Sequence, residues 1–294
     1  MLGTGIIQVA ARTPANIGMI SMSLASMSKD RFVLGLGASG PQVVEGWHGV
    51  PFKGTQQRLR ETVDIVRIIS RGERLAYNGD YFTLPLPGGE GKALKSGAQP
   101  REIPIYLATL SPRGLRMTGE IADGWLGTSF IPEHADVFFA HIREGAEKAG
   151  RTLADIDLQA AAGAVQFSDD VEKLIAPRKP GLAFTLGAMG SAQHNFYNDA
   201  YKRAGYDEEA RYVQRLWLEG KRDEAAAAVP DEMVLTTNLI GTPDMVRARL
   251  QAHRDAGVNT VRVQPTGRTV EEQVETLGRL MELVKEVSSE PAAV

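Results

Sequence analysis

Residues 30–52 read DRFVLGLGASGPQVVEGWHGVPF, and the rest of the chain is interpreted from this stretch. The apolar run at residues 32–34 predicts a buried strand. The glycine-rich turn at residues 35–40 lets the backbone approach another group closely. We expect that group to be a ligand at the carboxyl end of the strand.

Residues 35–40 also fit G-x-G-x-x-G, the pattern of a dinucleotide-binding turn. In that fold the turn runs straight into a helix, and an acidic residue follows about 20 positions later at the end of a second strand. Here Pro41 and further glycines and prolines follow, so we expect no regular helix before about Gly54. The acidic residue at the matching distance, Glu61, falls within a helical pattern. The stretch therefore favours a loop at a strand end, with a structural glycine turn as the alternative.

The composition limits the possible functions. The chain has 294 residues, 43% of them hydrophobic, which suits one α/β barrel or two ordinary domains. A net charge of −3 gives no reason to expect nucleic acid or an anionic membrane as partner. The chain has no cysteine and its histidines are scattered, so we expect no metal site. It contains neither a long apolar span nor a secretion signal, which predicts a cytoplasmic protein.

Outside the opening stretch, segments typical of strands and helices alternate. Further strands are predicted at residues 2–10, 103–108, 123–127, 156–167 and 260–263. Helices are predicted at residues 13–29, 54–70, 111–121, 132–149, 242–256 and 270–287. Residues 72–100 look like a loop insertion with a hairpin around residues 78–80, and residues 176–240 are an irregular, mostly helical excursion.

A strand followed by a helix thus occurs six times, which predicts parallel strands with crossover helices. Turns of glycine or small residues follow two of the strands, at residues 37–39 and 109–111. Ligands of TIM barrels bind at such turns, so the pattern favours a barrel over an open sheet.

Four segments resemble the luciferase-like superfamily, in particular its coenzyme F420-dependent oxidoreductases of actinobacteria. They are residues 30–52, quoted above, then PIYLATLSPRGLRMTGEIADGWL (104–126), MGSAQHNFYNDAYKRAGY (189–206) and LIGTPDMVRARLQAHRDAGVNTVRV (239–263). The resemblance implies one α/β domain over residues 1–294, a TIM (β/α)8-type barrel.

Members of that family have two further βα units before the strand that matches residues 2–10. The first two βα units are therefore expected to be missing here, which would leave open sheet edges. A misassigned start codon, a truncated chain, or a partner that covers the edge would each explain this.

The resemblance also implies a site for the deazaflavin ring. In relatives the strand that matches residues 2–10 ends in a bulge, often with a non-prolyl cis peptide, which here would join Gly5 and Ile6. Gly37, Ala38 and Ser39 match the loop along the ring. Ala38 stands where the family's sugar-phosphate dehydrogenases have a glutamate that acts on the substrate, which argues against glucose 6-phosphate.

Thr109, Leu110 and Ser111 match the loop that receives the cofactor's phosphate in relatives. The start of a helix is a suitable site for an anion. The alternative is a simple Ser-Pro helix cap.

Four residues are candidates for the substrate side of the site: Trp47, His48, Arg178 and Met189. Trp47 and His48 have packed or solvent-facing roles as alternatives, and Arg178 has an ordinary surface role. Gln42 and Glu45 are polar residues of the same loop, without an assigned role. No catalytic residue is identified.

The resemblance thus implies an oxidoreductase that transfers a hydride between F420 and a small organic substrate. The cofactor carries the chemistry, and the protein supplies orientation and a dry site. The alternatives are an FMN-dependent monooxygenase of the same fold and a truncated, non-catalytic form. Luciferase-like proteins commonly dimerise, so a homodimer is expected.

Overall fold

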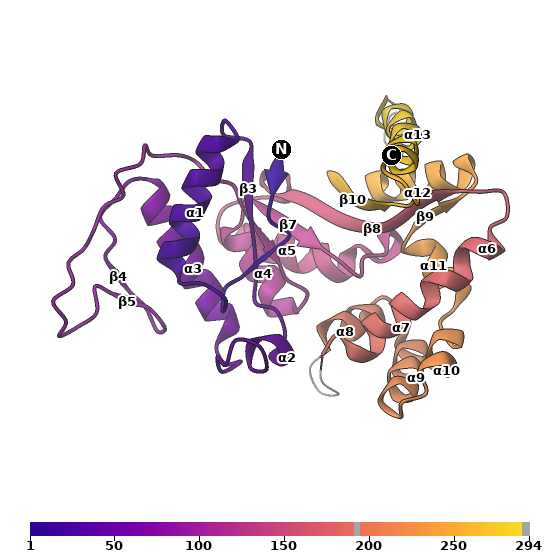
Figure 1. Ribbon diagram of the computed structural model, residues 1–294, viewed down its shortest axis with the longest axis horizontal. Coiled ribbons are helices and arrows are strands. Elements are labelled where there is room, and N and C mark those ends of the chain that lie inside the picture. The colour runs from indigo at the N-terminus through magenta and orange to yellow at the C-terminus, as the bar shows by residue number, and fades with distance from the viewer. Residues whose placement is uncertain (191–194, 290–294) are drawn as a thin grey trace. The chain divides into compact units, whose positions relative to one another are not determined.

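The computed structural model describes residues 1–190 and 195–289, and these fall into two compact units (Figure 1). Unit 1 comprises Met1–Leu126 and Ile142–Ile156, and unit 2 comprises Gly127–His141 and Asp157–Val294. The third of the four segments that carry the resemblance includes residues 191–194, which lie outside the described residues.

Unit 1 alternates strands with helices. Its strands are β1 (Leu2–Gly3), β2 (Ile7–Gln8), β3 (Phe32–Gly37), β6 (Ile105–Ala108) and β7 (Gly124–Gly127). Its helices are α1 (Pro14–Met27), α2 (Pro41–Val44), α3 (Thr55–Ser70), α4 (Pro112–Ile121) and the later part of α5 (Asp136–Lys148). A short 3-10 turn, η2 (Leu153–Asp155), follows.

These five strands of unit 1 pair in parallel, as the alternation of strands and helices predicts. β1 and β2 both pair with β3, β3 pairs with β6, and β6 pairs with β7. The core of this unit includes Leu34 and Leu36 of β3 and Ile105 and Leu107 of β6, which are fully buried. Apolar residues of α1 and α3 complete it, among them Ile17 and Leu59.

The predicted insertion forms a hairpin of β4 (Tyr77–Asn78) and β5 (Thr83–Leu84). The fully buried carboxylate of Glu61 on α3 holds its turn. This carboxylate accepts hydrogen bonds from the backbone amides of Asp80, Tyr81 and Phe82 at 2.8 to 3.0 Å. The residue that a nucleotide-binding turn would use for a ribose therefore anchors the insertion.

In unit 2 the long strand β8 (Asp157–Phe167) pairs in parallel with β9 (Leu239–Gly241) and with β10 (Thr260–Pro265). Its 3-10 turns are η1 (Pro132–His134) and η3 (Ala176–Arg178). Its helices after β8 are α6 (Glu172–Ile175), α7 (Lys179–Ala188), α8 (Phe196–Arg203), α9 (Asp207–Leu218), α10 (Arg222–Ala227), α11 (Asp231–Thr236), α12 (Pro243–Asp255) and α13 (Val270–Ser289).

The described residues between 176 and 240 are mostly helical, and they pack around a core that includes Leu186, Val213 and Met233. Strand β9 at the end of the excursion was not predicted. It has three residues, all buried, which is too short for a periodic pattern in the sequence.

Three expectations are corrected in detail. The strand expected over residues 2–10 is divided into β1 and β2. The first turn of the helix expected over residues 132–149 is the 3-10 turn η1. A helix also starts before Gly54, because Pro41 begins the single turn α2, where its missing N–H costs nothing.

Candidate functional site

The predicted bulge lies between β1 and β2. Leu2 pairs with Phe32 and Ile7 pairs with Leu36, so the first strand has one residue more than β3 between the two pairs. The Gly5–Ile6 peptide bond in this bulge is cis, as the resemblance implies.

The side chain of Thr4 bridges the gap that the bulge leaves in the ladder. Its Oγ1 donates a hydrogen bond to the carbonyl oxygen of Gly35 and accepts one from the Gly35 amide, both at 2.9 Å. A Cβ atom on Gly35 would lie 2.0 Å from the Thr4 carbonyl oxygen, and one on Gly37 would lie 2.7 Å from Cδ1 of Ile6. The sequence predicted that a ligand approaches the backbone closely at these glycines. In the structure the neighbouring residues Thr4 and Ile6 occupy that space.

The structure brings most of the predicted cofactor residues to one edge of the sheet of unit 1. Gln8 pairs with Gly37, and Gly37 pairs with Ala108, so the carboxyl ends of β2, β3 and β6 are adjacent. Gly37 ends β3, Ala38 and Ser39 follow it, and Thr109 to Ser111 follow β6, whereas Gly5 and Ile6 directly precede β2. Ser39 has φ of 62°, in the left-handed region, and so turns the chain away from β3.

The loop after β6 leads directly into α4. Ser111 is the N-cap, and its Oγ accepts a hydrogen bond from the Gly114 amide at 3.2 Å. The first turn of α4 contains no acidic residue, so its positive end carries no carboxylate of its own. The Thr109 side chain is buried and hydrogen-bonds Thr118 across 2.7 Å, which gives this threonine a structural role.

Unit 1 has a cavity of about 510 Å³. Its lining includes Ile6, which was predicted to contact the cofactor ring, and Trp47 and His48, which were predicted to contact the substrate. Ile6, Gln8, Trp47 and His48 are among the residues that line it. Nε2 of His48 lies 3.0 Å from Oε1 of Gln8, and the Trp47 side chain is largely exposed. Glu45 does not line this cavity, and its carboxylate accepts from the Phe52 amide at 2.9 Å, which closes the loop.

The other two substrate-side candidates belong to unit 2. Arg178 donates from Nη1 to the carbonyl oxygen of Leu174 and from Nη2 to Oε1 of Gln166, the latter at 2.7 Å. Burial lowers the pKa of the Arg178 guanidinium from its ordinary value. Met189 follows α7 and is partly exposed.

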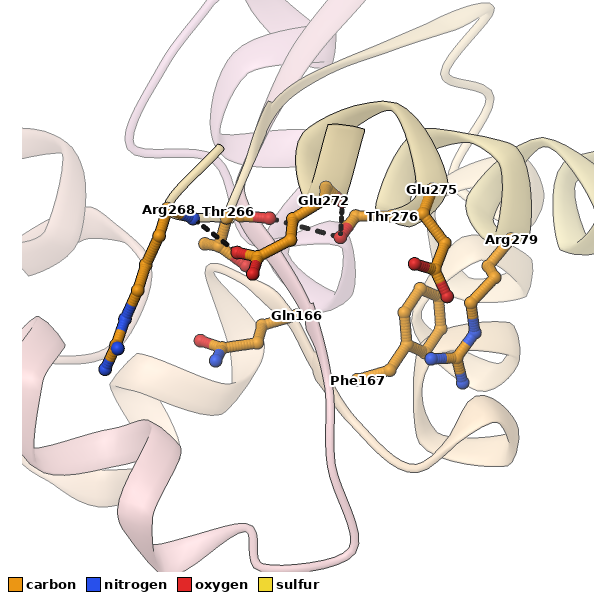
Figure 2. Close-up of a pocket in the computed structure, with 9 residues that line it drawn as sticks. Gln166, Phe167, Thr266, Arg268, Glu272, Glu275, Thr276 and Arg279 are labelled. Atoms are coloured by element: carbon orange, nitrogen blue, oxygen red, sulfur yellow. Dashed lines mark hydrogen bonds between the residues drawn. The ribbon is translucent and has the colours of Figure 1, made fainter. Parts of the chain in front are cut away.

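A second cavity, of about 470 Å³, lies in unit 2, and sequence reasoning missed it (Figure 2). It is lined by the end of β8, the turn after β10 and the first half of α13. Glu272 accepts from the Arg268 amide at 2.6 Å, and the guanidinium of Arg279 lies over the Phe167 ring, 4.2 Å from its centroid. Gln166, which Arg178 holds, is a further lining residue.

This second cavity carries Arg268 and Arg279 together with Glu272 and Glu275, so its formal charges balance. The carboxylate of Glu272 already accepts the hydrogen bond of the Arg268 amide, which lies next to the start of α13. The only signal in the sequence was the polar turn at residues 266–269, which gives no chemistry by itself. In residues 1–190 and 195–289, no group of three or more His, Cys, Asp or Glu side chains is arranged to hold a metal ion.

The model of the family described as luciferase-like monooxygenase matches residues 1–260. A protein of Mycobacterium tuberculosis named as a coenzyme F420-dependent oxidoreductase, Rv3520c, is 39% identical over 95% of this chain and 82% of its own length. The 5,10-methylenetetrahydromethanopterin reductase of Archaeoglobus fulgidus is 27% identical over 95% of this chain and 81% of its own.

Among solved structures, the coenzyme F420-dependent tetrahydromethanopterin reductase of Methanopyrus kandleri is similar in fold. Its TM-score is 0.76 at 26% identity, over 94% of this chain and 81% of that chain. The α/β fold predicted from the sequence is therefore that of F420-dependent, luciferase-like enzymes. Because the family model covers most of the chain, the protein belongs to the luciferase-like monooxygenase family.

Proposed function

We propose that this protein is an oxidoreductase that transfers a hydride between coenzyme F420 and a small organic substrate. The observation that carries the proposal is the 39% identity to an F420-dependent oxidoreductase over 95% of the chain. The identity of the substrate stays open.

The edge of unit 1 fits a planar ring and an attached anion. A Cβ atom added to Gly5 would have no heavy atom within 4 Å, so the backbone beside the cis bond faces open space. The uncompensated start of α4 is suitable for a phosphate. Gly5, Ile6, Ala38 and Ser39 would then lie against the ring, and Gly37 would end the strand beside them.

On this proposal Leu110 and Ser111 would hold the phosphate. The hydrogen bond between the buried side chains of Thr109 and Thr118 would fix the position of this loop. When bound, F420 supplies the carbon that accepts or gives the hydride. The residues of this chain bind and orient the two reactants, which lowers the entropic cost of bringing them together. Trp47 and His48 would contact the substrate.

An anaerobic titration tests this proposal against the FMN-dependent monooxygenase alternative. Purified protein is titrated with F420 and, separately, with FMN, and binding is followed by cofactor fluorescence. We expect saturable binding of F420 and weaker or no binding of FMN. Tight FMN binding with oxygen-dependent turnover and no F420 binding would support the monooxygenase, and binding of neither would support a non-catalytic form.

We also propose that residues 1–294 act as one barrel domain, that the protein is a homodimer, and that it works in the cytoplasm. In the part of the chain that the structure describes, no helix is long and apolar enough to cross a membrane.

Two measurements test the proposed dimer and the proposed single domain. Sedimentation of the purified protein measures whether it is a dimer. A single cooperative unfolding transition, seen by both fluorescence and circular dichroism, is expected if residues 1–294 form one domain.

A further inference from the structure

Unit 1 has a further cavity, of about 280 Å³, whose lining is mainly positive. It lies between α3, α4 and the part of α5 that belongs to unit 1, and we call it the basic groove. Its charged lining residues are the cations Arg60, Arg113, Arg116 and Lys148 and the carboxylate Glu120. It shares no lining residue with the cavity beside β2.

The periodicity of the helices brings these side chains together. Arg113, Arg116 and Glu120 are three or four residues apart on α4 and therefore share one face. Arg60 lies one turn after Gln56, near the start of α3. Neither α3 nor α4 has an acidic residue in its first turn, so the positive ends of both helices add to the charge of the groove.

The ion pairs around the groove do not balance its charge. Nη1 and Nη2 of Arg60 donate to the two carboxylate oxygens of Glu120, at 3.0 and 2.5 Å. Nε of Arg116 donates to Oε2 of Glu144 at 2.5 Å, and Nζ of Lys148 lies 3.4 Å from Oε1 of the same carboxylate. The charge of Glu144 is therefore divided between two cations.

Arg113 adds a cation without a counter-ion. It is exposed, and in the part of the chain that the structure describes its guanidinium has neither a hydrogen-bond partner nor an ion-pair partner. Three of the four cations are arginines, whose planar guanidinium donates two parallel hydrogen bonds to one phosphate group. The basic groove thus combines an excess of positive charge with free donors that suit phosphate.

The cations are too widely spaced for a single phosphate. Arg113 and Glu120, which Arg60 holds, are separated by about 10 Å along the axis of α4. A chain of linked phosphates would reach both ends of this span. The volume of the groove suits a small molecule.

We propose that the basic groove binds a small oligophosphate, with Arg113 at one end of the phosphate chain and Arg60 at the other. The phosphates would offset the mutual repulsion of the four cations. This binding site goes beyond the proposed hydride transfer, and the binding does not require F420.

Calorimetric titration of the protein without F420 tests the proposal, with inorganic triphosphate and orthophosphate as separate probes. We expect saturable binding of one triphosphate per chain. Orthophosphate should bind at least about tenfold more weakly, because it can reach only one end of the groove. Absence of saturable triphosphate binding, or equal affinity for the two probes, would overturn the proposal.

Two variants locate the bound triphosphate. Arg113→Gln and Lys148→Gln each remove one cation and leave the pairs Arg60–Glu120 and Arg116–Glu144 in place. We expect each change to raise the Kd of triphosphate by about tenfold, through loss of a charged hydrogen bond. Arg143→Gln removes the same charge from an exposed position of α5 outside the lining, and its Kd should stay within about twofold of the wild-type value.

The variants separate this groove from other sites. Weaker binding in Arg113→Gln but not in Lys148→Gln would place triphosphate at the start of α4 alone and would overturn the proposal. An equal loss in Arg143→Gln would show that overall charge causes the binding, which would also overturn it. Since F420 is absent from these titrations, their failure would leave the proposed function unaffected.

Discussion

At Gly35 the space for a side chain is occupied by backbone. An added Cβ atom would lie 2.0 Å from the carbonyl oxygen of Thr4, and an oxygen in the main chain cannot rotate away as a flexible side chain can. We expect Gly35→Ala to lower the free energy of unfolding by about 1–3 kcal/mol, measured by urea denaturation. Gly97→Ala is the control, because its Cβ would have nothing within 4 Å. Equal urea midpoints for the two variants would contradict this account of β3.

His253 on α12 gives the protein a pH-dependent stability. Its ring is buried, Nδ1 lies 2.8 Å from the carbonyl oxygen of Arg249, and Nε2 has no hydrogen-bond partner among the described residues. Burial lowers the pKa of His253, and the nearby charges of Arg249 and Glu133 act in opposite directions. The folded protein thus binds this proton less readily than the unfolded chain does.

The pKa of this histidine in the unfolded chain is about 6.5. The contribution of His253 to the free energy of unfolding is therefore complete above that pH and is lost as the pH falls below it. We expect the urea midpoint of the wild-type protein to fall as the buffer is changed from about pH 7.5 to about pH 5.5. The fall should be shallower in His253→Leu. Parallel pH profiles for the two proteins would show that another group causes the change.

At the scale of elements, the hairpin of β4 and β5 depends on one carboxylate of α3. Besides the three backbone amides, Glu61 accepts from Nε2 of Gln57 at 3.1 Å. In Glu61→Gln an amide group would face these donors, and we expect a loss of about 2–3 kcal/mol in unfolding free energy. Limited proteolysis should then cut residues 72–100 faster. Glu90→Gln, an exposed change in the same insertion, should match the wild-type protein in both measurements.

The sequence predicted those helices and turns whose stabilising hydrogen bonds join residues close together in the chain. The Thr13-Pro14 pair marked the start of α1, where the Thr13 side chain accepts from the Asn16 amide at 3.3 Å. The turn at residues 78–80 marked the hairpin in the same way. The role of Glu61 was not predictable, because its partners at residues 80–82 are 19 to 21 positions away and bring no pattern of their own.

The same limit applied to the site. The turns after β3 and β6 were predicted to bind a ligand, as in a TIM barrel, and Gly37 and Ala108, which come before these turns, are paired. The reason for Gly35 and Gly37 was misjudged, because the sequence does not reveal that the bulge at Thr4 to Ile6 fills the space beside them. The cavity of unit 2 was missed because its lining combines the end of β8 at Gln166 and Phe167 with the turn after Pro265, about 100 residues later.

For the whole molecule, the order of six strands and their helices was predictable, since each βα unit carries its own apolar pattern and turn. It agrees with the family match over residues 1–260. The chemistry of the substrate follows from no such pattern, because in this family the cofactor supplies the reactive atom and the loops supply the contacts. We propose that the F420 site lies at the edge of unit 1.

Two matched helix caps test this placement of the F420 site. Ser111 caps α4 at the proposed phosphate site, and Thr13 caps α1. Replacing either by alanine should cost about 1 kcal/mol of stability. In fluorescence titrations with F420, the wild-type protein and Thr13→Ala should bind alike, and Ser111→Ala should bind about tenfold more weakly, equivalent to about 1.4 kcal/mol. Equal F420 affinity in all three proteins would contradict this placement of the cofactor.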